Sequence, residues 1–460
     1  MHLLLALLVA QAAAPRTFRV DYFHTGTATE ERFSLDRLVL EPLAWPGNPA
    51  RPVDDTNSGK YLFEVRDRAT NRILYSRGFS SIYSEWVDTP EALSAARTFS
   101  ESFRFPQPAG PVQLILRKRD PRTNLFQEIW TLLVDPQDPF VDDARPPSAG
   151  ALIALQKRGD PARKVDLLIL GDGYMAAERG KFEKDARRLI DVLFAHSPFK
   201  ERRDDFNVWG LCPAAAESGI SRPSTGVHKR SPVSAGYDAF GSERYILTFE
   251  NRAFRDLASQ APYELVEILT NSNTYGGGGI FNLYSTVAAD SLWSPYVFVH
   301  EFGHHIAGLA DEYFTSENSM VPSSLRLEPW EPNVSASPAG DKLKWRALLT
   351  PGAPLPTPWD EQGFIEWQAG VQTRRRAIRA ARKPESEMDA LFAAEKIEDT
   401  RKLSSEKYAG AVGAFEGANY EAKGFYRSQA DCIMFTRDDV PFCAACKSAI
   451  ERIIDLDTEK

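Results

Sequence analysis

The chain has 460 residues, of which 43% are hydrophobic and 26% charged, and a formal net charge of -8. This length is too great for one ordinary core, so two or three domains are expected, and the hydrophobic content is sufficient to build them. The negative charge argues against a polyanionic partner, and we expect no nucleic acid to bind. Beyond the N-terminus, no apolar run is long enough to cross a bilayer, so no transmembrane segment is expected.

Residues 1–14 are typical of a secretory signal peptide. Residues 3–10 form a short apolar core, and residues 11–14 (QAAA) supply small side chains for cleavage. Only His2 and the terminal amine provide positive charge ahead of that core, which leaves a cytosolic start as the alternative. The expected localisation is secreted or periplasmic.

The pattern of residues 15–140 predicts an N-terminal β-sandwich. Short stretches alternate apolar and polar residues between turns rich in Pro, Gly, Asn and Asp. The predicted strands are residues 18–23, 61–65, 72–75, 112–116 and 126–134. Trp86 and Trp130 favour core packing over a glycan-binding platform. Prolines then indicate a stiff linker at residues 141–150, ahead of a second domain at residues 151–460.

The second domain begins with a predicted strand and helix. Residues 165–170 (VDLLIL) form an apolar run of strand length, and residues 176–194 have a helical pattern. The GDGY sequence between them contains Asp172, but it lacks the lysine and spacing of a phosphate-binding P-loop. A structural turn is therefore expected there.

A run of glycines follows at residues 275–282 (YGGGGIFN). Glycines allow another backbone to approach closely, so an extended segment at these positions would pair with a substrate as an added strand. The residues expected to make such contacts are Gly277, Gly278, Gly279 and Ile280. A mobile surface loop explains the same composition equally well.

The most informative motif is residues 300–304 (HEFGH). On a helix, His300 and His304 project to the same side, with ring nitrogens able to reach one ion. A catalytic zinc takes three protein ligands and leaves its fourth position to water. Glu301 follows the first histidine directly, which places its carboxylate beside the metal as a general base. The motif predicts one catalytic Zn2+ ion in a metallopeptidase.

The context of the motif argues against a chance match or a packed core histidine. Ser294 is expected to be the N-cap, Pro295 the first helical residue and Gly308 the stop. Three of the seven histidines in the chain fall within residues 300–305.

A polar insertion follows the motif. Charges of both signs alternate along two predicted helices, residues 374–383 and 385–402, as on solvated faces. Residues 412–426 are then rich in glycine and aromatic side chains, including Tyr420, and are expected to form a pocket wall beside the zinc.

Three of the four cysteines lie near the C-terminus. An even number of cysteines in an exported chain favours one or two disulfides, whose pairing the spacing leaves open. A four-cysteine structural zinc site is the alternative, although only one CxxC pair is present. The residues concerned are Cys212, Cys432, Cys443 and Cys446.

Residues 300–313 (HEFGHHIAGLADEY), 432–434 (CIM) and 442–446 (FCAAC) resemble the bacterial IgA-peptidase family of zinc metallo-endopeptidases, which is related to the metzincins. The resemblance implies a metzincin-like α/β zinc peptidase domain preceded by a β-domain. It also implies that Met434 lies in a turn beneath the metal.

The same resemblance implies that Asp311, three residues beyond Gly308, is the third zinc ligand. Metzincins have a histidine at this position and their glycine one residue earlier, so Glu312 stays an alternative ligand. Thr436 stands where some metzincins have a tyrosine that assists the transition state, and the group that stabilises the oxyanion is therefore unassigned.

These observations predict an α+β, multidomain, secreted zinc endopeptidase that acts on a protein or peptide. A non-catalytic, zinc-stabilised binding protein that works through its β-domain is one alternative, but such a site would have no need of Glu301. A zinc amidase acting on a non-protein substrate is the other. The motif fixes the reaction and leaves the cleavage specificity to the shape of the pocket.

Overall fold

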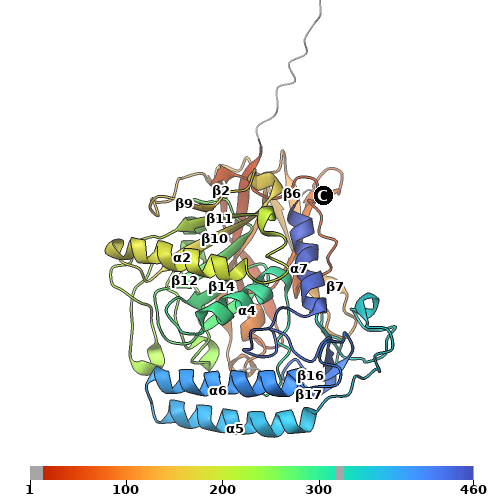
Figure 1. The fold of residues 1–460 in the computed structure, drawn as a ribbon. Helices are drawn as coiled ribbons and strands as arrows, with labels where there is room; N and C mark the ends of the chain where they lie inside the picture. The colour runs from red at the N-terminus through yellow and green to blue at the C-terminus, as the bar shows by residue number, and fades with distance from the viewer. Residues whose placement is uncertain (1–13, 316–325, 459–460) are drawn as a thin grey trace, which may run out of the picture.

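The structure, a computed structural model, describes residues 14–315 and 326–458, so residues 1–13 of the predicted signal peptide lie outside the described part. An N-terminal sheet domain precedes a larger domain of mixed helices and strands (Figure 1). This mixed α+β, multidomain architecture agrees with the sequence-based prediction. Among the helices of the described residues, none is long and apolar enough to cross a membrane.

The N-terminal domain consists of two four-stranded sheets, with strand orders β5-β1-β2-β8 and β4-β3-β6-β7. All neighbouring pairs are antiparallel except β2 and β8, which run parallel. The strands are β1 (Arg16–Gly26), β2 (Glu31–Ala44), β3 (Tyr61–Asp67), β4 (Ile73–Phe79), β5 (Arg97–Pro106), β6 (Val112–Arg119), β7 (Phe126–Val134) and β8 (Val141–Asp142). A short helix, α1 (Ile82–Trp86), separates β4 from β5.

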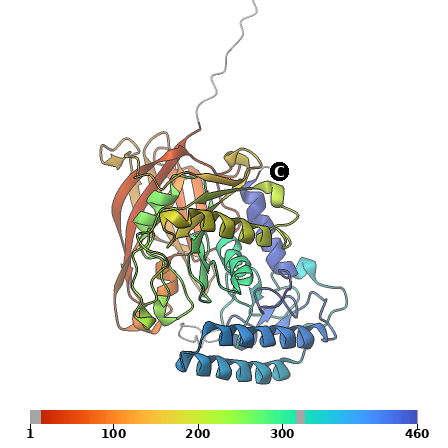
Figure 2. The same ribbon diagram turned by 60° about the vertical axis from the view of Figure 1, so that its left-hand side comes forward.

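One core joins the two sheets. β1 buries Phe18, Val20 and Tyr22 at every second position, and Phe63 and Val65 of β3 meet them from the other sheet. Side chains of a strand alternate between its two faces, so these three residues share one face; Arg19 and Asp21 on the other face of β1 are also buried. The red and orange strands of this domain stand beside the larger domain in the turned view (Figure 2). Burial of the Trp86 side chain confirms its expected role in packing.

The larger domain is built on a six-stranded sheet of order β13-β14-β12-β10-β11-β9. The four central strands are parallel, and β9 and β13 pair antiparallel at the two edges. The strands are β9 (Ile153–Gln156), β10 (Val165–Asp172), β11 (Phe206–Leu211), β12 (Leu265–Thr270), β13 (Gly277–Ile280) and β14 (Tyr284–Ala288). Its helices are α2 (Arg179–Leu193), α3 (Asn251–Ala258), α4 (Ser294–Ala307) and, near the C-terminus, α7 (Ala444–Asp457).

The central sheet is covered on both faces. β10 is buried at every position, as expected of such a strand. Its Leu167 and Ile169 share a core with residues of α2, α4 and α7. Its Leu168 and Leu170 instead share a core with α3 and with Trp86 of the N-terminal domain. The N-terminal domain is therefore packed against the sheet that positions α4.

The GDGY sequence overlaps the end of β10, because Gly171 and Asp172 belong to the strand, and the predicted structural turn follows at Gly173, where φ is 77°. The Asp172 carboxylate accepts hydrogen bonds from the Ser231 hydroxyl (2.6 Å) and from the backbone N–H groups of Val233 (3.1 Å) and Ala235 (2.9 Å). These bonds hold a long loop against the end of the strand.

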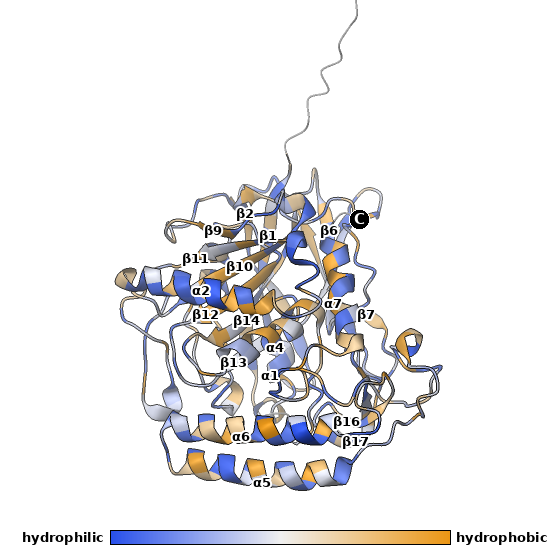
Figure 3. Ribbon diagram, in the orientation of Figure 1, coloured by the Kyte–Doolittle hydropathy of each residue, from blue (hydrophilic) through white to orange (hydrophobic). Residues whose placement is uncertain are grey.

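The insertion after α4 contains two paired helices, α5 (Glu361–Ala380) and α6 (Glu385–Ser404), which run along one end of the molecule (Figure 1). Both helices carry hydrophilic and hydrophobic residues (Figure 3). Two helices were predicted here, but α5 begins at Glu361 and not at residue 374. A small sheet follows, formed by β15 (Val334–Ser335), β16 (Phe415–Ala418) and β17 (Glu421–Arg427) in the order β15-β17-β16.

Candidate metal centre

Helix α4 carries the HEFGH motif. Pro295 lies in its first turn, and Gly308 ends it in the left-handed conformation, with φ at 58°. The expected N-cap was wrong by one residue, because Trp293 occupies the cap position and Ser294 is the first helical residue. The Ser294 hydroxyl accepts a hydrogen bond from Arg188 (3.2 Å) and does not cap the helix.

Three side-chain atoms converge beside α4. His300 Nε2 and His304 Nε2 lie 3.1 Å apart. Asp311 Oδ1 lies 3.0 Å from the first nitrogen and 3.3 Å from the second. Because Gly308 reverses the chain after the helix, the aspartate returns to the same side as the two histidines. The structure thus brings together the three residues predicted to bind zinc.

The outer nitrogens of both rings face backbone carbonyls. His300 Nδ1 is 2.9 Å from the carbonyl oxygen of Ile433, and His304 Nδ1 is 2.5 Å from that of Leu309. A carbonyl oxygen only accepts hydrogen bonds, so each Nδ1 carries a proton, and in the neutral, metal-binding form of each ring Nε2 presents a lone pair. This orientation by a carbonyl is typical of histidines that bind metals.

Two lone pairs and a carboxylate oxygen therefore point at one another. Asp311 is buried, and its Oδ1 has no hydrogen-bond donor among the described residues other than these rings. Three acceptors at such distances repel unless a proton or a metal cation lies between them. The donor set of two imidazoles and one carboxylate fits a divalent transition metal such as zinc.

The electrostatics of the cluster also favour positive charge. Burial alone would lower the pKa of His304, but the Asp311 carboxylate raises it to about 9. Burial alone would raise the pKa of Asp311, but His304 and His300 hold it well below its ordinary value. Without a metal, a proton on His304 therefore supplies the positive charge beside Asp311, and a metal ion bound there would replace that proton.

Tyr420 holds the carboxylate of Asp311. Its hydroxyl donates to Asp311 Oδ2, and the backbone N–H of Asn419 donates to the Asp311 carbonyl (3.0 Å). Asn419 and Tyr420 form the two-residue turn between β16 and β17, with φ values of 53° and 63°. Glycine or asparagine is usual in such turns, and a bulky residue there costs about 1–3 kcal/mol. The strain is consistent with a need for the tyrosine hydroxyl at this position.

We expect Tyr420→Phe to weaken metal binding by about 10–100-fold, because it removes a hydrogen bond that orients a ligand. Metal affinity is measured by competition with a chelator. Tyr426→Phe is the matched control, since it removes a hydroxyl from the same hairpin that contacts Glu416 instead. Equal affinities in the two variants would contradict this role.

The other histidine of α4 has a structural role. His305 Nε2 accepts a hydrogen bond from the Val266 N–H (3.1 Å), and its Nδ1 donates to the Ile280 carbonyl (3.1 Å). Burial lowers the pKa of His305 to about 3, so the ring is neutral at ordinary pH. It ties α4 to the sheet and takes no part in the cluster.

The turn that contains Met434 packs against α4. Met434 is fully buried, and a Cβ placed on Gly303 would lie 3.2 Å from its sulfur. The neighbouring Ile433 carbonyl faces His300, and the Met434 carbonyl accepts from the Glu312 N–H (2.8 Å). The turn thus contacts both the helix and the segment that supplies Asp311.

Glu312 does not join the histidine cluster. Its Oε1 accepts a hydrogen bond from Asn333 Nδ2 (3.0 Å) and lies beside the sulfurs of Cys443 and Cys446. The alternative of Glu312 as third ligand therefore has no geometric support. Thr436 also lies apart from the ligands, since its hydroxyl bonds the Asp431 carboxylate (2.7 Å).

The expected disulfides are wrong, because all four cysteines are free. The sulfurs of Cys432 and Cys446 are 3.9 Å apart, well beyond a bond of about 2.05 Å. A site of four cysteines is also excluded, because the fourth, Cys212, packs against Gly171 on β10. The even number of cysteines predicted disulfides, but the fold does not place any two of their sulfurs at bonding distance.

The glycine run is an edge strand and not a surface loop. β13 pairs antiparallel with β14 and lies directly against α4. A Cβ on Gly279 would be 2.2 Å from the Glu301 carbonyl oxygen, and one on Gly277 would be 2.5 Å from Val297. Glycine is thus required for the close approach of strand and helix.

Only part of this edge is open. The N–H of Gly277 donates to the Arg244 carbonyl and its carbonyl accepts from the Ile246 N–H, both at 3.1 Å. Alternation along the strand points the backbone groups of Gly278 and Ile280 toward β14. Gly279 faces outward, and its backbone groups have no hydrogen-bond partner among the described residues.

We expect Gly279→Ala to lower the free energy of unfolding by about 1–3 kcal/mol, because its methyl group would collide with the backbone of α4. Gly370→Ala is the control, since this glycine lies within α5 with open space around it. That variant is expected to gain about 0.5–1 kcal/mol. Urea unfolding of both provides the measurement, and an unchanged stability of Gly279→Ala would contradict the packing argument.

The cluster of His300, His304 and Asp311 opens into a cleft with a volume of about 980 Å³. Glu301 and the ligands lie on one side of it. The N-terminal domain supplies another wall, through residues that the sequence did not identify: Lys60, Glu85, Asp88, Lys118 and Arg119. Glu85 also accepts a hydrogen bond from Tyr245 of the larger domain (3.2 Å). The cleft is therefore formed by both domains.

The Glu301 side chain is half-buried in this cleft. Burial raises the pKa of its carboxyl, and His300 and His304 oppose that shift. A carboxylate with a raised pKa accepts a proton more readily, which suits a general base.

A cleft between two domains that is lined by a few converging polar side chains is a usual place for an active site. Residues 153–454 match the IgA Peptidase M64 family, and residues 10–131 match the Peptidase M64 N-terminus. The chain belongs to the IgA peptidase M64 family, as the motifs indicated, and membership implies peptidase activity. A search of curated proteins gave no match.

Proposed function

We propose that the protein is a secreted or periplasmic zinc endopeptidase, with residues 15–140 as its N-terminal domain and residues 151–460 as a metzincin-like catalytic domain. The observation that carries this proposal is the convergence of His300 Nε2, His304 Nε2 and Asp311 Oδ1 to within 3.3 Å of one another beside Glu301. The M64 designation also suggests a metal. The predicted signal peptide supports export.

In the proposed mechanism, Glu301 is the general base. It takes the proton from the attacking water and passes it to the leaving amine. Zinc, when bound, supplies Lewis acidity toward the scissile carbonyl and the water. Tyr420 keeps the Asp311 carboxylate oriented, and Met434 packs against the helix that carries the histidines.

The substrate is proposed to be an extended segment of a protein or peptide that lies along β13. Gly279 offers a free N–H and carbonyl there, next to the helix that carries Glu301. Main-chain pairing of this kind holds a peptide without selecting its side chains. Selection is then left to the cleft walls, including the charged residues of the N-terminal domain.

A binding protein that keeps zinc only for stability would not need Glu301 in an open cleft, so the enzyme is favoured. The test is digestion of a complex peptide library by the purified protein, with and without chelator. Internal cleavage that stops with chelator and returns with zinc supports the proposal. If the zinc-loaded protein cleaves no peptide, the proposal is contradicted. Hydrolysis of a non-protein amide without cleavage of any peptide would favour the amidase.

A further inference from the structure

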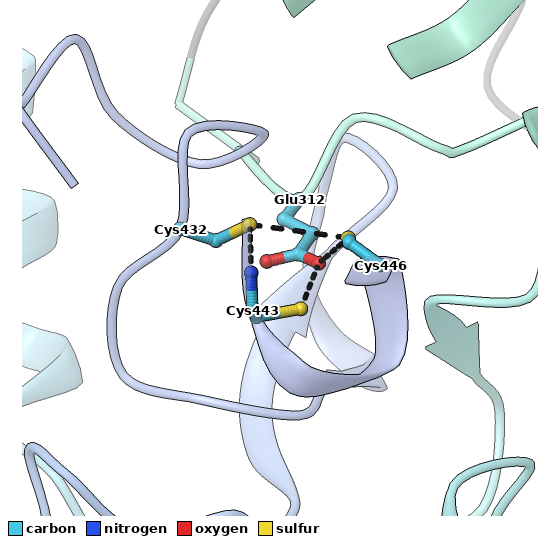
Figure 4. Close-up of side chains that lie close together, drawn as sticks. All are labelled: Glu312, Cys432, Cys443 and Cys446. Atoms are coloured by element: carbon cyan, nitrogen blue, oxygen red, sulfur yellow. Dashed lines mark hydrogen bonds between the residues drawn. The ribbon is translucent and has the colours of Figure 1, made fainter. Parts of the chain in front are cut away.

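The geometry points to a second metal site, formed by Cys432, Cys443, Cys446 and Glu312, that would take a thiophilic divalent cation such as zinc (Figure 4). This inference does not depend on the peptidase chemistry proposed above. The four ligand atoms all lie within 4.8 Å of one another. Figure 4 shows the three sulfurs surrounding the glutamate carboxylate.

The separations fit a metal better than a disulfide. Glu312 Oε1 lies 3.4 Å from the Cys443 sulfur and 3.3 Å from the Cys446 sulfur, and the Cys432 and Cys446 sulfurs are 3.9 Å apart. Around a tetrahedral zinc with Zn–S bonds of about 2.3 Å, ligand atoms are separated by roughly 3.6–3.8 Å. The observed distances lie on both sides of that range, so small movements would place all four atoms around one ion.

The burial of the cluster supplies a second, independent argument. All four residues are buried, with Glu312, Cys432 and Cys446 at 0% exposure. Glu312 Oε2 has no hydrogen-bond partner among the described residues. A carboxylate buried without a full set of partners is costly, and a cation bound between it and the sulfurs would remove that cost.

The surrounding backbone is arranged for a thiolate. The N–H groups of Met434 (3.4 Å) and Cys443 (3.2 Å) both point at the sulfur of Cys432. Cys443 and Cys446 stand at the start of α7, where the helix dipole favours negative sulfur. Binding would release the thiol protons to solvent and involves no oxidation.

The position of the cluster suggests its role. Glu312 follows the proposed ligand Asp311 directly, and Cys432 begins the turn whose Ile433 carbonyl faces His300. A closed site with four protein ligands is structural and leaves no position for a substrate. A metal here would fasten α7 and the Met434 turn to the segment that carries Asp311.

Cadmium is a suitable probe, because its bonds to thiolates absorb in the ultraviolet and its bonds to imidazole and carboxylate do not contribute that band. We expect the reduced full-length protein to bind about two cadmium ions per chain and to show the thiolate band. The double variant Cys443→Ser, Cys446→Ser should bind about one ion fewer and lose the band. Cys212→Ser, the matched control, should still bind about two cadmium ions and show the thiolate band.

The double variant tests the site only if it folds, so X-ray absorption at the zinc edge of the wild-type protein provides a second measurement. Sulfur neighbours at about 2.3 Å support the site. Nitrogen and oxygen neighbours alone, a thiolate band that survives in the double variant, or a disulfide between these cysteines would overturn it. These signals are independent of peptidase activity, so an inactive protein with sulfur-bound zinc would contradict the proposed function and support this site.

Discussion

Glu301→Gln is expected to keep its metal and to lose at least about a hundredfold in kcat, the contribution usual for a general base. Glutamine has nearly the same shape, and the three proposed ligand atoms lie on other residues. The substitution therefore removes the proton acceptor and leaves the metal site unchanged. Peptide cleavage rates and metal content of the same preparation provide the measurement.

The matched control is Glu85→Gln, which removes a carboxylate from the wall of the cleft that the N-terminal domain supplies. Glu85 is proposed to contact substrate and not the reacting atoms, so its loss should change KM more than kcat. Near-normal kcat in metal-loaded Glu301→Gln protein would exclude the proposed mechanism.

Asp311→Ala is expected to lose most of the metal bound at the histidine cluster and nearly all activity. Among the described residues, Asp311 is the one acidic residue grouped with the two histidines, with all three ligand atoms within 4.8 Å of one another. Its removal would leave the metal with two protein ligands. Glu312→Ala should keep the peptidase activity, because Glu312 lies with the cysteines. Activity together with metal content distinguishes the two variants. Activity that is lost in Glu312→Ala and kept in Asp311→Ala would reassign the third ligand.

The helix that carries the site was predictable because the relevant interactions are local. The spacing of His300 and His304 fixes their common side, and Gly308 supplies the left-handed stop that returns Asp311 to them. The strand at β10 was predictable for a similar reason, since a continuous apolar run of that length is usual in a central strand. The role of Met434 came from the family resemblance, and the structure places that residue against α4.

Interactions between distant segments could not be predicted. The cysteines meet Glu312, which is more than a hundred positions earlier in the chain, and only the folded structure brings these groups together. The cleft wall formed by the N-terminal domain depends on how that domain packs against the sheet.

β5 was not predicted and the start of α5 was misplaced, although local signals for both were present. β5 alternates Phe99, Phe103 and Phe105 with polar residues, which is a strand pattern. α5 begins well before the predicted residue 374, because Asp360 caps it by accepting a hydrogen bond from the Gly363 N–H (3.0 Å).

The central claim is that His300, His304 and Asp311 hold the catalytic metal. Crystals of zinc-loaded protein, measured on both sides of the zinc absorption edge, test it most directly. The account predicts an anomalous peak between the three ligand atoms, at bond lengths of about 2.0–2.2 Å. No anomalous peak at that position, or a peak bonded to other side chains in its place, would contradict the account.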